Sequence, residues 1–252
     1  MRLLVIIPAF NEQEALGGLL AEIAELRARA AAETGDAIEA VVVDDGSADR
    51  TAQVARAGGA RVLLLCKNLG IGGAVQSGLR LAYREGFDLA AQIDGDGQHP
   101  PSELPRLLAS ARGAGAPDLI VGTRYREPGS GFRSTPLRRL GSAWLRLVLR
   151  LVGVRVTDPT SGFRLYGPRA LGLFDETYPY DFPEPESLAV ARAAGLAIAE
   201  VPVTMRERQG GHSSIAGLST VYYMLKVTLA VALAYFRARR RGPKLEVSDA
   251  AS

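Results

Sequence analysis

Cysteine is almost absent from this chain, which has 252 residues and a single cysteine, Cys66. One cysteine excludes a disulfide framework within the chain, so a reducing compartment is the default expectation. Because Cys66 lies in the apolar run V-L-L-L-C, we expect it to be a core residue. Histidine occurs only twice, which leaves few side chains suited to act as a general base near neutral pH.

The chain also lacks a strong charge imbalance and an N-terminal targeting signal. Its net charge is +3 and 47% of its residues are hydrophobic. We therefore expect one large domain or two small ones, and no nucleic-acid partner. The start, M-R-L-L-V-I-I-P, passes directly into polar residues, without the longer apolar region and cleavage site of a signal peptide. We interpret it as a first strand.

Strand and helix patterns alternate along the first half of the chain, with short loops between them. Such alternation predicts an α/β fold with a mostly parallel, doubly wound sheet and helices on both faces. Asn11 and Glu14 have the spacing of a capping box at the start of the first helix. The predicted strands are 3–7, 40–43, 61–65, 89–93 and 119–121, and the predicted helices are 12–33, 49–57, 70–83 and 102–112.

The pattern changes after Tyr125. A Gly/Ser-rich loop at 128–134 precedes an amphipathic Arg/Leu helix at 137–152, which would lie on another helix or on a membrane surface. A polar, turn-forming segment, T-D-P-T-S-G-F-R, follows it. Further on, the sequence predicts a helix at 185–194 and a strand at 197–203.

The segment 218–236 is largely apolar and close to the ~20 residues of a membrane span. However, it contains Lys226 and is followed at once by R-A-R-R-R. This combination favours a helix on a membrane surface, with a single span and an ordinary packed helix as alternatives. The predicted organisation is a catalytic domain at 1–215, an amphipathic membrane-associated helix at 216–241 and a disordered tail at 242–252.

Two predicted strands end in acidic residues, Asp44-Asp45 and Asp94 with Asp96. The second pair lies in Q-I-D-G-D-G-Q-H-P-P, where carboxylates at i and i+2 and the amide of Gln98 at i+4 are oxygen ligands of the kind that Mg²⁺ or Mn²⁺ prefers. Gly95 would let the backbone approach a ligand. A plain Asp/Gly turn is the alternative. Two acid-tipped strands at one carboxyl edge favour a polar site.

Four motifs together carry a family resemblance: V-I-I-P-A-F-N-E, V-V-V-D-D-G-S-A-D-R-T, N-L-G-I-G-G-A-V-Q-S-G and I-D-G-D-G-Q-H-P-P. In this order they resemble the nucleotide-sugar-binding half of family 2 glycosyltransferases, which have a GT-A fold. The later G-T-R-Y and D-P-T-S-G-F-R-L-Y are similar to the dolichyl-phosphate mannose synthase-like branch. The resemblance covers roughly residues 3–214.

The resemblance implies a metal-dependent, inverting hexosyltransferase at the cytoplasmic face of a membrane. It would move a sugar, mannose or glucose, from a GDP- or UDP-sugar to a dolichyl or undecaprenyl phosphate. Only one candidate membrane segment is present, which leaves room for a membrane-protein partner. The donor residues that the resemblance implies are Asp94, Asp96 and Gln98 as ligands of Mg²⁺ or Mn²⁺, Gly95 beside them, Pro8, Phe10 and Glu12 around the nucleoside, and Asp45 or its neighbour Asp44 on the base or ribose.

On the acceptor side, the resemblance implies that Arg124 contacts a phosphate or the incoming acceptor, joined by Arg139 and Arg208. The guanidinium fork suits a phosphate dianion. Members of this branch usually carry S-K after the Gly-rich loop, where this chain has Ser213-Ser214, and Arg206 is the candidate substitute.

An acceptor phosphate is already anionic, so it needs no strong general base. For His99 we therefore favour a structural turn residue bonded to the backbone over a base, and His212 is as readily a solvated loop residue. A soluble family 2 enzyme with a saccharide or protein acceptor, using Glu184 or Glu186 as base, is the alternative. A non-catalytic binding module fits the intact D-x-D-x-Q set poorly. An NAD-binding Rossmann enzyme is disfavoured, because P-A-F-N-E rather than G-x-G-x-x-G follows the first strand.

Overall fold

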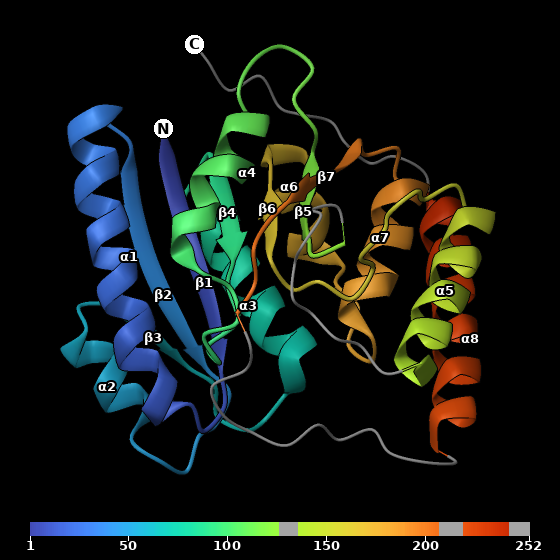
Figure 1. Cartoon of the computed structure of the whole chain (residues 1–252), viewed down its shortest axis with the longest axis horizontal. Coiled ribbons are helices and arrows are strands. Elements are labelled where there is room, and N and C mark those ends of the chain that lie inside the picture. Colours follow the sequence, from blue (N-terminus) through green and yellow to red (C-terminus); the bar gives the residue numbers. More distant parts are fainter. Residues whose placement is uncertain (126–135, 207–218, 242–252) are drawn as a thin grey trace.

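A computed structural model describes residues 1–125, 136–206 and 219–241. A seven-stranded sheet runs through these residues in the order β3-β2-β1-β4-β6-β5-β7 (Figure 1). All neighbouring strands are parallel except at β6, which runs antiparallel to both β4 and β5. The predicted mostly parallel sheet is therefore confirmed. The strands are β1 (Arg2–Ala9), β2 (Ala37–Asp44), β3 (Arg61–Leu64), β4 (Leu89–Gln92), β5 (Leu119–Thr123), β6 (Arg164–Tyr166) and β7 (Ile198–Pro202).

Helices cover both faces of the sheet, as the sequence predicts. One face packs against α1 (Gln13–Glu33), α2 (Thr51–Ala57) and α4 (Leu104–Ser110), which follows the short 3₁₀ helix η1 (Pro101–Glu103). The other face packs against α3 (Gly70–Arg84), α6 (Pro168–Glu176) and α7 (Pro183–Ala193). Outside α7 lie α5 (Pro136–Leu151) and α8 (Ser219–Arg241).

The first strand explains this layered arrangement. Its side chains from Leu3 to Ile7 have no exposed surface. Successive residues of a strand point to opposite faces of the sheet, and helices cover both faces. Leu4 and Ile6 join the core under α3, while Leu3, Val5 and Ile7 join the core under α1. A continuous apolar run is what a strand covered on both faces requires.

Two local predictions are wrong, and two elements were missed. Asn11 and Glu14 form no capping box, because Asn11 has a positive φ of 56° and its side-chain oxygen accepts a hydrogen bond from the Ala48 N–H. Cys66 is exposed rather than buried, because β3 is an edge strand that ends at Leu64. The sequence also missed β6 and α6. A three-residue strand that contains the fully buried Arg164 has no alternating pattern to detect.

The C-terminal helix α8 packs against α7 and α5. Val227 and Val231 point inward and are buried in the core. No helix within the described ranges combines the length and the apolarity needed to cross a bilayer. The predicted loop at 128–134, the domain boundary at 215/216 and the predicted tail at 242–252 lie outside the described residues.

Candidate active site

The carboxyl ends of β1, β2 and β4 meet at one edge of the sheet. In the strand register, Ala9 of β1 pairs with Asp44 of β2, and Ile6 of β1 pairs with Gln92 of β4. The chain beyond β4 then turns across the end of β1, where the Gly95 N–H donates to the main-chain oxygen of Pro8 over 3.3 Å. A Cβ atom at Gly95 would lie 3.1 Å from that oxygen, so a glycine allows this close approach.

An open pocket of about 490 Å³ lies at this edge, within the ~300–1,000 Å³ typical of small-molecule sites. The structure also separates the neighbours Asp44 and Asp45. Asp45 lines the pocket, whereas the Asp44 carboxylate accepts a hydrogen bond from the Ser47 N–H in the turn below. The lining residues are the predicted Pro8, Phe10, Glu12, Asp45, Asp94, Gly95 and Asp96, together with Ala9, Ile71 and Ala74.

The charge of the pocket wall indicates what it can bind. Four of the lining residues carry carboxylates, and no lysine or arginine of the described part of the chain is among them. An anionic diphosphate would be repelled by this wall unless a cation lies between them. The donor set therefore fits a divalent metal. The four carboxylates are those of Glu12, Asp45, Asp94 and Asp96.

Asp94 and Asp96 are well placed to hold that metal. The Asp94 carboxylate is 31% exposed and faces the pocket, and Asp96 is 6% exposed. No group of three acidic, histidine or cysteine side chains converges on a metal-binding point in the described residues. Mg²⁺ is commonly held by one or two carboxylates and completed by substrate phosphates, so the two aspartates can suffice. Gln98, the predicted third ligand, is not among the lining residues, and its main-chain N–H donates to Asp96.

Two buried hydrogen bonds in series support the Asp94 carboxylate, and no local pattern predicted them. The Gln92 amide donates to an Asp94 carboxylate oxygen over 3.3 Å, and the Tyr166 hydroxyl donates to the Gln92 oxygen over 3.0 Å. Gln92 and Tyr166 are at most 1% exposed. Burial raises the pKa of Tyr166, so its hydroxyl keeps its proton and remains a donor. The two hydrogen bonds therefore restrain the orientation of the Asp94 carboxylate.

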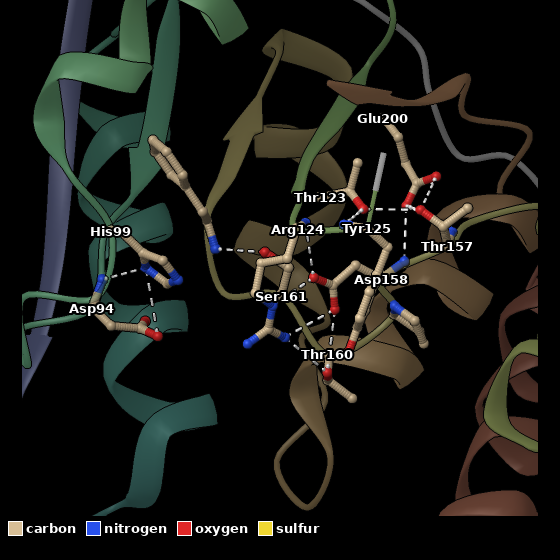
Figure 2. A network of polar contacts seen from close by, with 12 residues as sticks. Asp94, His99, Thr123, Arg124, Tyr125, Thr157, Asp158, Thr160, Ser161 and Glu200 are labelled. Carbon is tan, nitrogen blue, oxygen red and sulfur yellow. Dashed lines mark hydrogen bonds and ion pairs between the residues drawn. The ribbon is translucent and has the colours of Figure 1, made fainter. Parts of the chain in front are cut away.

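His99 occupies the structural role favoured for it. Its Nδ1 accepts a hydrogen bond from the Asp94 N–H over 3.1 Å, and its ring is 3% exposed (Figure 2). The ring also stacks on Phe163, with ring centres 5.3 Å apart. Because Nδ1 already accepts a hydrogen bond, His99 positions the Asp94 backbone.

The residues Thr157 to Arg164, called here the 157–164 segment, join the metal loop to the rest of the site. A Cβ atom at Gly162 would lie 2.7 Å from an Asp94 carboxylate oxygen, so the backbone of the segment touches the predicted metal ligand. At its other end, the Thr157 and Asp158 N–H groups donate to Glu200 on β7 over 2.7 and 2.9 Å (Figure 2). The sequence indicated that this segment is polar and turn-forming and that it carries part of the family resemblance, but it did not predict these contacts.

Arg124 is held by the same segment. Its Nε and one terminal nitrogen donate to the two oxygens of Asp158 over 2.8 and 3.0 Å. Asp158 has no exposed surface. Burial opposes the charge on Arg124, but the hydrogen bonds and charge of Asp158, with a smaller contribution from Asp94, keep its pKa above the ordinary value. A permanent cation therefore lies close to the acidic pocket.

A second arginine, Arg164, anchors the segment to α7. It is fully buried and donates to the main-chain oxygens of Ser161 and Glu184 and to the Ser187 hydroxyl, over 2.6 to 2.8 Å. Hydrogen bonds to uncharged oxygens thus satisfy three of the N–H donors of this buried guanidinium. Burying the group without such partners would cost free energy. Its role is to hold the 157–164 segment in place.

Several predicted residues lie away from the pocket or outside the described residues. Arg206 pairs through its side chain with Glu22 on α1 over 2.6 Å and is not among the pocket-lining residues, so its role as substitute for the lysine stays a prediction. Neither Glu184 nor Glu186 lines the pocket, and Glu186 accepts a hydrogen bond from the Phe182 N–H. The Arg139 side chain, Arg208, His212, Ser213 and Ser214 lie outside the described residues.

Comparison with known proteins now places this geometry in a family. Residues 4–172 match the model for glycosyl transferase family 2. The chain belongs to glycosyl transferase family 2. This glycosyltransferase is 36% identical to an undecaprenyl-phosphate mannosyltransferase of Micrococcus luteus, over 86% of this chain and 88% of that protein. It is 34% identical to a polyprenol monophosphomannose synthase of Mycolicibacterium smegmatis, over 90% of this chain and 85% of that protein.

The fold of the glycosyltransferase also matches solved structures. A glucosyl-3-phosphoglycerate synthase from Mycobacterium tuberculosis, crystallised with Mn²⁺ and UDP, superposes with a TM-score of 0.67. The match covers 93% of this chain and 79% of that protein, at 23% sequence identity. At this identity the likeness shows the fold alone, which confirms the predicted GT-A-like architecture.

Replacing either acidic residue of the metal loop, Asp94→Asn or Asp96→Asn, is expected to weaken binding of GDP or UDP in the presence of Mn²⁺ by at least about tenfold. The fold should survive, because each change removes one charge from a crowded group of carboxylates. Isothermal titration calorimetry measures the affinity and thermal unfolding checks the fold. Asp88→Asn, at the opposite end of β4, is the matched control. Unchanged nucleotide affinity in both loop variants would contradict the metal assignment.

Single and double replacements in the Arg124–Asp158 pair can separate the contribution of Arg124 to stability from its contribution to sugar transfer. Arg124→Ala leaves Asp158 buried without its partner and is expected to lower stability by about 3–5 kcal/mol. Replacing both residues, as Arg124→Met with Asp158→Leu, should restore most of that stability but little sugar transfer. Denaturant unfolding and a transfer assay measure the two effects. Recovery of transfer together with stability would mean that Arg124 only supports the fold.

Proposed function

We propose that this glycosyltransferase moves mannose from a nucleoside diphosphate sugar to a polyprenyl phosphate at the cytoplasmic surface of a membrane. The observation that carries the proposal is the near full-length similarity to two proteins that are both named for mannosyl transfer to a polyprenol carrier. The acidic donor pocket with a cation close to it supports the same chemistry.

The donor would lie in the pocket at the ends of β1, β2 and β4. Pro8, Phe10 and Asp45 would contact the nucleoside, while Asp94 and Asp96 would hold Mg²⁺ or Mn²⁺, with Gln98 as a proposed further ligand. Such a metal supplies charge neutralisation for the diphosphate leaving group. The chain itself contributes orientation, because Gln92 and the His99 ring restrain Asp94 on two sides.

The acceptor phosphate would approach from the side of Arg124. One of its oxygens forms the bond to the anomeric carbon as the bond from that carbon to the nucleoside diphosphate breaks, which inverts the configuration. The positive charge of Arg124 would attract the acceptor, and Arg139 and Arg208 are proposed to assist. Because this nucleophile is already anionic, the site needs no carboxylate base. The absence of Glu184 and Glu186 from the pocket lining agrees with this.

A panel of radiolabelled donors and acceptors tests the proposal. The purified full chain with Mn²⁺ is given GDP-mannose, UDP-mannose or UDP-glucose, each with a detergent-dispersed polyprenyl phosphate, phosphoglycerate or a free monosaccharide. We expect label from a mannose donor to enter the organic phase only with the polyprenyl phosphate and to be released by mild acid as mannose. Asp96→Asn should abolish the product, and Asp88→Asn should retain it.

Two results would overturn the proposal. Label transferred to phosphoglycerate or the monosaccharide in preference to the polyprenyl phosphate would replace the lipid acceptor with a soluble one. A glucose donor used at least about tenfold better than either mannose donor would replace the sugar.

A further inference from the structure

The outer helices α5 and α8 each carry a second row of apolar side chains that faces away from the core. Their inner rows are buried, as Leu149 and Val231 show. The outer rows hold seven of the fourteen large hydrophobic side chains exposed in the described residues, a concentration beyond ordinary scatter. Between 45% and 80% exposed, these are Trp144, Leu147 and Leu151 on α5, and Leu225, Leu229, Leu233 and Phe236 on α8.

The two rows form one surface, called here the α5/α8 face. The helices lie side by side at the right edge of Figure 1, with α7 between them and the sheet. Trp144 Nε1 donates to the Thr228 hydroxyl over 2.9 Å, which links the rows. Leu225, Leu229 and Leu233 are four residues apart and therefore share one side of α8. From Leu225 to Phe236 the stripe extends about 16 Å.

The charged side chains that α5 and α8 themselves carry are all basic. Neither 136–151 nor 219–241 contains an aspartate or glutamate. Two copies of the chain that met through this face would bring like charges together, which disfavours a dimer. An apolar stripe flanked by cations is instead the pattern of helices that lie on anionic lipid. The exposed basic side chains on these helices are Arg150, Lys226, Arg237, Arg239 and Arg240.

We propose that the α5/α8 face docks the enzyme on an anionic lipid bilayer. The apolar rows enter the interfacial layer and the basic side chains lie at the headgroups. The inference rests on the proposed function in that a polyprenyl phosphate acceptor lies in a bilayer. It assigns the contact to one surface built jointly by two helices that lie far apart in the sequence, whereas the sequence indicated a membrane contact for each helix separately.

Trp144 provides a native probe of this surface, because it is the only tryptophan in the chain. The full chain is titrated with vesicles of phosphatidylcholine mixed with phosphatidylglycerol, and with phosphatidylcholine alone. We expect the Trp144 emission to shift to shorter wavelength on the anionic vesicles and to be quenched by lipids brominated on their acyl chains. The response should weaken as salt is added. Binding of the anionic vesicles without a change in Trp144 emission would overturn the proposal, as would no binding.

Point variants locate the contact. Deleting α8 is unsuitable, because Val227 and Val231 belong to the core. Leu151→Gln with Leu229→Gln should lower vesicle partitioning by about tenfold or more, which corresponds to about 1.4 kcal/mol. The matched control is Leu64→Gln with Tyr83→Gln, whose side chains are 56% and 49% exposed elsewhere on the surface, and it should bind as the parent does.

Two further measurements separate the alternatives. If the Leu151/Leu229 variant partitions as the parent does, or if its mass in sedimentation without vesicles differs from that of the parent, the face is not a lipid contact. With a water-soluble, short-chain polyprenyl phosphate, this variant should keep its transfer rate. Vesicle binding by a parent protein that transfers to no polyprenyl phosphate would refute the proposed function and leave the docking surface standing. Transfer to a polyprenyl phosphate by a parent protein whose Trp144 emission does not change on vesicles would refute the docking surface and leave the proposed function standing.

Discussion

The parallel pairing of β1 with β2 on one side and β4 on the other is the constraint on which the candidate donor site depends. This register brings the ends of three strands to one edge, so that Pro8, Asp45 and Asp94 line the same pocket although they are far apart in the sequence. The pairing is stable because β1 is apolar on both faces and is covered on both. A shift of two residues in the β4 register would carry Asp94 away from the pocket.

Charge separation is the second feature of the site. The pocket wall is acidic, so an anionic diphosphate would need a cation between itself and the wall. A basic group, Arg124, lies nearby and pairs with Asp158. Neither of these two residues lines the pocket. The 157–164 segment sets the spacing between the pocket wall and Arg124, because Gly162 touches Asp94 while Asp158 binds Arg124. In the proposed function, this arrangement would let one anionic substrate bind through a metal while a second one approaches the guanidinium of Arg124.

Local patterns predicted six of the seven strands and the acid-tipped edges, because apolar runs and turn residues act over a few positions. The family resemblance, rather than a local pattern, implied most of the pocket residues. The contacts that fix the site could not be predicted from local patterns. Tyr166 reaches Gln92 across 74 residues, and Glu200 reaches Thr157 across 43. Such pairs have no local signature. Likewise, the amphipathic pattern of 137–152 indicated an apolar face, but only the packing shows which side of α5 is buried and which is exposed.

We propose that the donor completes the metal site, because two carboxylates alone leave coordination positions open. Electron paramagnetic resonance of Mn²⁺ titrated into the protein tests this most directly, with and without a nucleoside diphosphate. The account predicts weak Mn²⁺ binding alone, binding at least about tenfold tighter with the nucleotide, and loss of that gain in Asp94→Asn. Equal Mn²⁺ affinity with and without nucleotide, or equal nucleotide affinity after EDTA treatment, would contradict it.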